Sequence, residues 1–147
     1  MKTHFLAVVA AILGAASLSA DDFIGSRESA FKESSYDFRL MKSAIAAAPS
    51  WLAGAESPPL SPRKAHEIAL AQAQKLRPEV TTWRPDDIRL EPVAGGNAGT
   101  YLEAGWIYVV TLLDFSGPIG GVPWQLEIPV YLDGSTISPV ITKRKRP

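Results

Sequence analysis

Residues 106–113 form an apolar run that would place large side chains on both faces of an extended chain. Successive side chains of a strand point to opposite faces, so Trp106 and Tyr108 share one face while Ile107 and Val109 share the other. A strand with two apolar faces is typical of the middle of a sheet that is covered on both sides. The run therefore requires two covering layers.

The segment that follows Ser61 predicts a helix that can form one of these layers. Ser61 is suited to the N-cap, Pro62 is suited to the first helical position, and Pro78 ends the segment. Small and apolar residues recur between them at helical spacing, at Ala65, Ile68, Ala69, Gln72, Ala73 and Leu76. The small side chains on this face would allow the helix to approach a sheet closely.

Asp133-Gly134 predicts a two-residue hairpin turn between strands over residues 124–132 and 136–143. In the register that this turn sets, Val130 lies opposite Ile137, and the apolar residues of both strands share one face. The turn and the apolar pattern therefore agree.

Ile88 and Leu90 alternate with charged residues, which predicts a fourth strand with one buried face. Pro129 and Pro139 lack a backbone N–H, so we expect a bulge, a sheet edge or an early end of the ladder near them. Together these elements predict an α+β fold in which one main helix packs on a four-stranded antiparallel meander.

The N-terminal residues have the character of a secretory signal peptide over residues 1–20. Lys2 and His4 precede an apolar run of about fourteen residues, which is shorter than the roughly twenty that a membrane-spanning helix needs. Small residues then precede Asp21. We expect an exported protein, periplasmic or secreted, that begins near Asp21 and has no stable membrane span.

Residues 21–57 are expected to form an N-terminal arm or linker, and residues 58–147 the α+β domain with a basic tail. Within the arm, residues 35–48 can be drawn as a short helix, because apolar residues recur there at spacings of three and four. The segment 38–52 or a partner chain is expected to cover the second face of the doubly apolar strand.

Composition excludes several classes of function. The formal net charge is +0 and the chain has no cysteine, which argues against nucleic-acid binding, disulfides and thiol chemistry. The local exception is the tail Lys143, Arg144, Lys145 and Arg146, which could contact an acidic partner or lipid headgroups.

No constellation of residues indicates catalysis, a metal or a cofactor. His66 is the only histidine outside the leader, so neither a nucleophile–base pair nor a histidine metal site is predicted. Asp86-Asp87, Asp114 and Glu127 are the candidate carboxylates for acid–base chemistry, and none has an identifiable partner. We expect the protein not to be an enzyme.

The helix containing Ala65-His66-Glu67-Ile68-Ala69-Leu70, the strand Trp106-Ile107-Tyr108-Val109-Val110 and the segment Val130-Tyr131-Leu132-Asp133-Gly134 together resemble PepSY and PepSY-like domains of exported bacterial proteins. The resemblance covers about residues 61–143. It implies a helix on a sheet and a binding or inhibitory module of the cell envelope, without catalytic residues.

Two segments are similar to the inhibitory loops of cystatins: Glu91-Pro92-Val93-Ala94-Gly95 to the first and Val122-Pro123-Trp124 to the second. Glu91 stands where those inhibitors have glutamine. An up-and-down meander would place the two loops at opposite ends of the sheet, whereas inhibition requires them on one rim.

The sequence therefore predicts an exported, non-enzymatic binding module with an unidentified protein or peptide partner and no nucleic-acid partner. The alternatives are a cystatin-like protease inhibitor and an enzyme built on carboxylates. The candidate binding surface comprises Trp106, Ile107, Tyr108, Val109, Trp124 and Tyr131.

Overall fold

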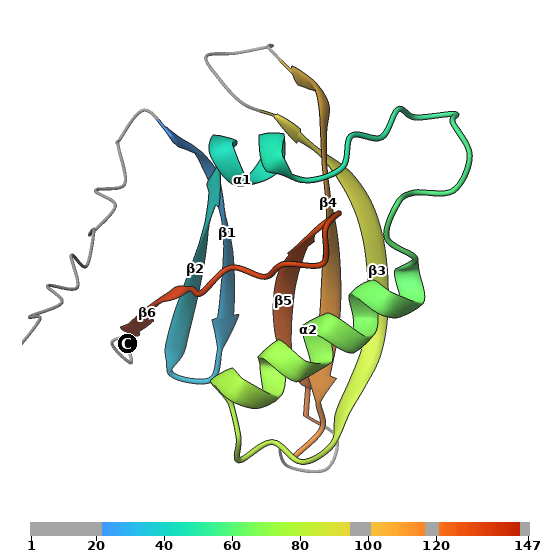
Figure 1. The fold of residues 1–147 in the computed structure, drawn as a ribbon. Coiled ribbons are helices and arrows are strands. Elements are labelled where there is room, and N and C mark those ends of the chain that lie inside the picture. Colours follow the sequence, from blue (N-terminus) through green and yellow to red (C-terminus); the bar gives the residue numbers. More distant parts are fainter. Residues whose placement is uncertain (1–21, 95–100, 117–120, 145–147) are drawn as a thin grey trace, which may run out of the picture.

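The computed structural model describes residues 22–94, 101–116 and 121–144, and these residues form two three-stranded antiparallel sheets and two helices (Figure 1). The first sheet has the order β1-β2-β6 and the second the order β3-β4-β5. The strands are β1 (Phe23–Phe31), β2 (Ser34–Met41), β3 (Trp83–Ala94), β4 (Tyr101–Asp114), β5 (Trp124–Tyr131) and β6 (Val140–Lys143). The helices are α1 (Lys42–Ala47) and α2 (Pro62–Leu76).

The expected four-stranded meander under one main helix is wrong, because the fold is mostly sheet and its strands are divided between two sheets. Only β3, β4 and β5 form the predicted meander. The N-terminal arm of that predicted fold is also wrong, since residues 23–41 form the hairpin β1–β2. Phe31, Tyr36 and Phe38 of this hairpin belong to the same buried cluster as α2.

The short helix predicted over residues 35–48 is replaced by a strand followed by the six-residue helix α1. Tyr36, Phe38 and Leu40 are buried while Arg39 is exposed, which is the two-residue period of a strand. Apolar spacings of three and four coexist with this alternation in the sequence. Pairing with β1 and β6 selects the extended form.

The hairpin after β5 has a three-residue loop instead of the predicted two-residue turn. The N–H of Gly134 donates to the carbonyl of Tyr131 at 2.9 Å, and the N–H of Tyr131 donates to the carbonyl of Ser135 at 3.0 Å. Gly134 has a φ of 86°, which suits the third loop position of such a hairpin. The register is therefore shifted, and Val130 lies opposite Thr136.

The returning chain does not continue along β5. It crosses to the other sheet, where β6 pairs with residues 34–37 of β2 (Figure 1). Pro139 directly precedes β6 and has no N–H for a ladder with β5. The expected early end of the ladder near the prolines is thus confirmed, although its consequence, a change of sheet, was not predicted.

Helix α2 confirms the predicted boundaries and cap. The hydroxyl of Ser61 accepts a hydrogen bond from the N–H of Lys64 at 3.2 Å, and Pro62 occupies the first turn. Ala65, Ala69 and Ala73 have no exposed surface. These small residues allow α2 to pack closely on the face of the sheet that carries Tyr108 and Val110.

The opposite face of the β3-β4-β5 sheet is covered by residues of the N-terminal region. Ile107 and Val109 pack in a second buried cluster with Leu40 of β2 and Ile45 of α1. The segment 38–52 therefore supplies part of the predicted second cover. Trp51, by contrast, packs edge-on against Trp106 of the α2 side, with 5.0 Å between ring centroids.

Strand β5 lies beside β1 without a backbone ladder between the two sheets. The N–H of Glu127 points away from β4 and donates to the hydroxyl of Ser29 at 2.9 Å. Pro129 has the same orientation two residues later, so it removes a donor from this edge and not from the β4 ladder. Among the residues described, neither helix has the length and apolar character needed to cross a membrane.

Candidate functional site

Three strand ends meet at one end of the β3-β4-β5 sheet. Trp83 at the start of β3 lies opposite Asp114 at the end of β4, and Asp114 lies opposite Trp124 at the start of β5. Because directly paired residues of neighbouring strands share a face, the carboxylate stands between two indoles. Phe31, at the end of β1, contacts both indoles, with ring centroids 5.4 Å from Trp83 and 6.3 Å from Trp124.

Asp114 has no exposed surface, and its charge is balanced within the protein. Its Oδ2 lies 3.2 Å from the Nζ of Lys32, and its two oxygens accept hydrogen bonds from the N–H and the hydroxyl of Ser116, each at 2.8 Å. Burial alone would raise the pKa of Asp114. The hydrogen bonds from Ser116 and the Lys32 ammonium outweigh burial and hold the pKa below its ordinary value.

Lys32 is the one non-glycine residue of the described chain with a positive φ, at 51°. It sits in the tight turn between β1 and β2, which contains no glycine, and its ammonium also lies 5.3 Å from the centre of the Phe31 ring. A left-handed backbone costs about 1 kcal/mol or more outside glycine. The ion pair with Asp114 and the ring contact offset that cost.

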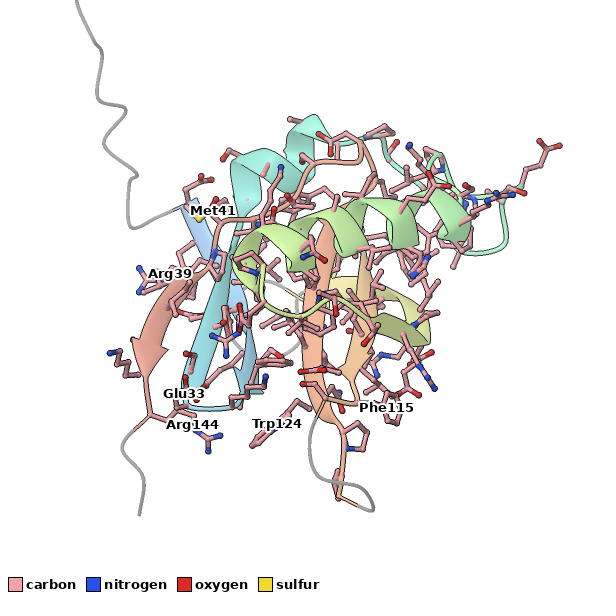
Figure 2. All side chains as sticks on the ribbon, turned by 90° about the horizontal axis from the view of Figure 1, so that it is seen from below. Glu33, Arg39, Met41, Phe115, Trp124 and Arg144 are labelled. Carbon is pink, nitrogen blue, oxygen red and sulfur yellow. The ribbon has the colours of Figure 1, made fainter. Side chains whose placement is uncertain are left out.

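The apolar side chains that follow Asp114 are exposed. Phe115 is 49% exposed, Val122 is 91% exposed and Trp124 is 40% exposed. The guanidinium of Arg84 lies over the ring of Phe115, 5.0 Å from its centre. We call Arg84, Phe115, Val122 and Trp124 the aromatic end. In Figure 2 the labelled residues of this end lie along the lower edge of the molecule, with Trp124 between Phe115 and Glu33 of the β1–β2 turn.

The basic tail begins next to the aromatic end. The N–H of Arg144 donates to the carbonyl of Glu33 at 2.7 Å, directly after the last residue of β6. Figure 2 places Arg144 and Glu33 on the same side of the molecule as Trp124. Lys143 and Arg144 are exposed, whereas Lys145 and Arg146 lie outside the described residues.

The six residues of the candidate binding surface do not share one surface. Trp106 and Tyr108 lie under α2, and the Tyr108 hydroxyl donates to the carbonyl of Leu60 at 2.9 Å. Ile107, Val109 and Tyr131 lie on the opposite face, where they are buried. Trp124 is the exposed member of the six.

Two of the candidate carboxylates, Asp87 and Glu127, are held by Arg89. Arg89 lies 3.2 Å from Asp87, 2.9 Å from Glu91 and 3.1 Å from Glu127, and Arg27 of β1 also binds Glu91. The hydrogen bond to Glu127 contributes most to a raised pKa of Arg89. This network joins β1, β3 and β5 across one face. Its carboxylate oxygens are occupied by guanidinium groups, so it has the geometry of a structural brace.

No cluster of three or more His, Asp or Glu side chains that could hold a metal ion occurs in the part of the chain that the structure describes. His66 lies on α2 with a buried Nε2 that has no hydrogen-bond partner among the described groups. Its neighbour Glu67 pairs with Arg63 and Lys64 instead.

The two cystatin-like segments lie at different ends of the sheet. Glu91 is paired through Ile107, and Trp124 through Asp114, seven residues farther along β4. At about 3.4 Å per residue this separates them by roughly 24 Å. The structure therefore does not bring them onto one rim.

Searches against protein-family models, curated proteins and solved structures each found no match. The function is accordingly argued from the residues of this chain. Sequence reasoning selected Trp124 but missed Arg84, Phe115 and Lys32. The position of Asp114 at the end of an apolar strand could have indicated the cation, because a carboxylate surrounded by aromatic residues needs a positive charge nearby.

Proposed function

We propose that the protein is an exported, non-enzymatic binding module of the cell envelope and that it binds through the aromatic end. The observation that carries the proposal is the exposure of Phe115, Val122 and Trp124 beside the buried Lys32–Asp114 pair. Exposed aromatic residues next to arginine are the side chains that contribute most energy to binding surfaces. Arg84 and Trp124 are held by pairing with Leu113 and Asp114 of β4, so these two residues need little ordering on binding.

The predicted signal peptide supports export, and the PepSY-like pattern supports a binding or inhibitory role in the envelope. The geometry adds no reaction to this role. Asp87, Glu91 and Glu127 are bridged by Arg89, and both carboxylate oxygens of Asp114 are bound by Lys32 or Ser116. A buried, ion-paired carboxylate is unsuited to proton transfer.

The first test is export. Mass spectrometry of the exported protein should find a chain that starts at Ala20 or Asp21, because Ser17 and Ser19 permit cleavage there. An intact Met1 would contradict the proposed export.

The second test measures how much of the purified mature chain sediments with an envelope preparation. The double variant Phe115→Ser/Trp124→Ser should lose about tenfold or more in affinity, since aromatic anchors typically contribute that much. Leu52→Ser is the matched control, because Leu52 is 63% exposed and lies outside the aromatic end. Equal retention of the parent and the double variant would refute the proposed surface.

A further inference from the structure

We infer that the aromatic end docks on an anionic lipid surface, with Phe115, Val122 and Trp124 entering the headgroup region. This inference rests on the proposed function, which it deepens by naming the partner. Trp and Phe side chains are enriched where proteins meet the membrane–water interface, because an apolar ring can be buried there while polar atoms stay hydrated.

The shape of the surface favours a partner that can deform around protruding side chains, as a lipid bilayer can. Val122 is 91% exposed, so this side chain stands clear of the protein. Trp124, two residues later, begins β5, and Phe115 directly follows the last residue of β4. Protruding apolar groups can enter a bilayer without a complementary pocket.

The charges around these side chains match an anionic surface. Arg84 lies over Phe115, and Lys143 and Arg144 are exposed at the end of β6. These three cations make no ion pair within the described residues, whereas Lys32 and Arg77 are balanced by Asp114 and Glu79. Long basic side chains of this kind can bury their stems in the headgroup region while their charges reach phosphates.

Two exposed carboxylates, Glu33 and Asp86, also belong to this end. The positive excess is therefore small, and entry of the apolar side chains provides most of the attraction. Each basic residue near an anionic surface strengthens binding roughly fivefold. We therefore expect a preference for anionic over zwitterionic lipid of about fivefold, reduced by added salt.

The test uses the mature chain and vesicles of phosphatidylcholine, alone or mixed with phosphatidylglycerol. Co-sedimentation and a blue shift of tryptophan fluorescence should appear with the anionic vesicles. Trp124→Ala and Phe115→Ala should each weaken binding about tenfold. Arg84→Glu should remove most of the preference for anionic lipid, and Arg63→Glu, a charge reversal at the start of α2, should leave it unchanged.

Val122→Ser keeps the test independent of folding, because a side chain that is 91% exposed contributes nothing to the core. This variant should also bind anionic vesicles more weakly. The inference fails if the parent ignores both kinds of vesicle, or if it binds an acidic peptide such as polyglutamate but no vesicle. Retention by envelope preparations that persists in that case would leave the proposed function standing with a protein partner. Loss of both would remove the proposed function as well.

Discussion

The ammonium of Lys32 lies 3.2 Å from the carboxylate of Asp114, which has no exposed surface. The pair links the turn of one sheet to the strand end of the other, and Lys32 is the non-glycine residue of the described chain that has a positive φ. The junction between the two sheets therefore includes an electrostatic contact beneath the aromatic end.

Lys32→Met should destabilise the protein, because it leaves the Asp114 carboxylate buried without a counter-charge. A fully buried pair would lose about 3–5 kcal/mol, but the Lys32 side chain is 27% exposed and solvent screens its charge. We expect a loss of about 2 kcal/mol in the free energy of unfolding, measured in urea. Lys143→Met, at an exposed position, should change it by less than about 0.5 kcal/mol. Equal effects of the two substitutions would show that the pair contributes nothing.

The stability of the protein should fall with acidification through the pH range below about 4. The pKa of Asp114 is lower in the folded than in the unfolded chain, so the unfolded chain binds more protons at these pH values. This contribution is complete above the ordinary carboxyl pKa and is lost as pH falls through the folded value. Urea unfolding at a series of pH values from 7 to 3 measures it. Asp114→Asn should be less stable at pH 7 and show a flatter dependence below pH 4, and parallel curves would argue against the assignment.

Gly134→Ala should cost about 2 kcal/mol of unfolding free energy, from a left-handed backbone and a crowded neighbour. Gly134 has a φ of 86°, and an added Cβ would lie 3.2 Å from Cδ1 of Ile68 in α2. Gly54 provides the control, since its φ is 90° but an added Cβ would meet nothing within 4 Å. Gly54→Ala should therefore cost only about 1 kcal/mol. Identical losses in thermal or urea unfolding would mean that Ile68 yields without cost.

Removal of residues 21–57 should abolish cooperative folding. The truncated chain lacks Phe31, Tyr36 and Phe38, whose side chains are buried in the cluster that also contains α2. It also uncovers Ile107 and Val109, which pack against Ile45. We expect no sharp urea transition and strong binding of a hydrophobic dye. A truncated chain that unfolds cooperatively and leaves the dye unbound would show that residues 58–147 fold alone.

Local patterns predicted the elements whose causes are local. Ser61, Pro62 and the spacing of Ala65, Ala69 and Ala73 specify α2, because capping and helical period act within a few residues. The two apolar faces of β4 were likewise read correctly. The turn at Lys32 was missed because it contains none of the residues that usually mark turns. Its ion-pair partner Asp114 lies far away in the chain.

The candidate site could be predicted only in part for the same reason. Trp124 was identified as a candidate binding residue. Phe31, which contacts Trp124, comes from β1, and Arg84, which lies over Phe115, comes from β3, so both contacts form only after folding. Conversely, Tyr108 and Tyr131 are aromatic residues of the kind that is common at binding surfaces. Packing of α2 and of the N-terminal region buries them, and burial raises the pKa of both phenols.

The sequence by itself determined that this chain builds a capped, alanine-faced helix and a strand that must be covered on both sides. The tertiary structure alone decided that β6 pairs with β2 and that residues 23–41 form a hairpin. Prolines at 129 and 139 remove backbone donors from the β5 hairpin and from the edge that faces β1, while β2 offers a free edge to β6. The hydrophobic periodicity of a helix or strand arises from residues that are neighbours in the chain. The choice of pairing partner depends on which strand edges, distant in the chain, retain free hydrogen-bonding groups in the folded protein.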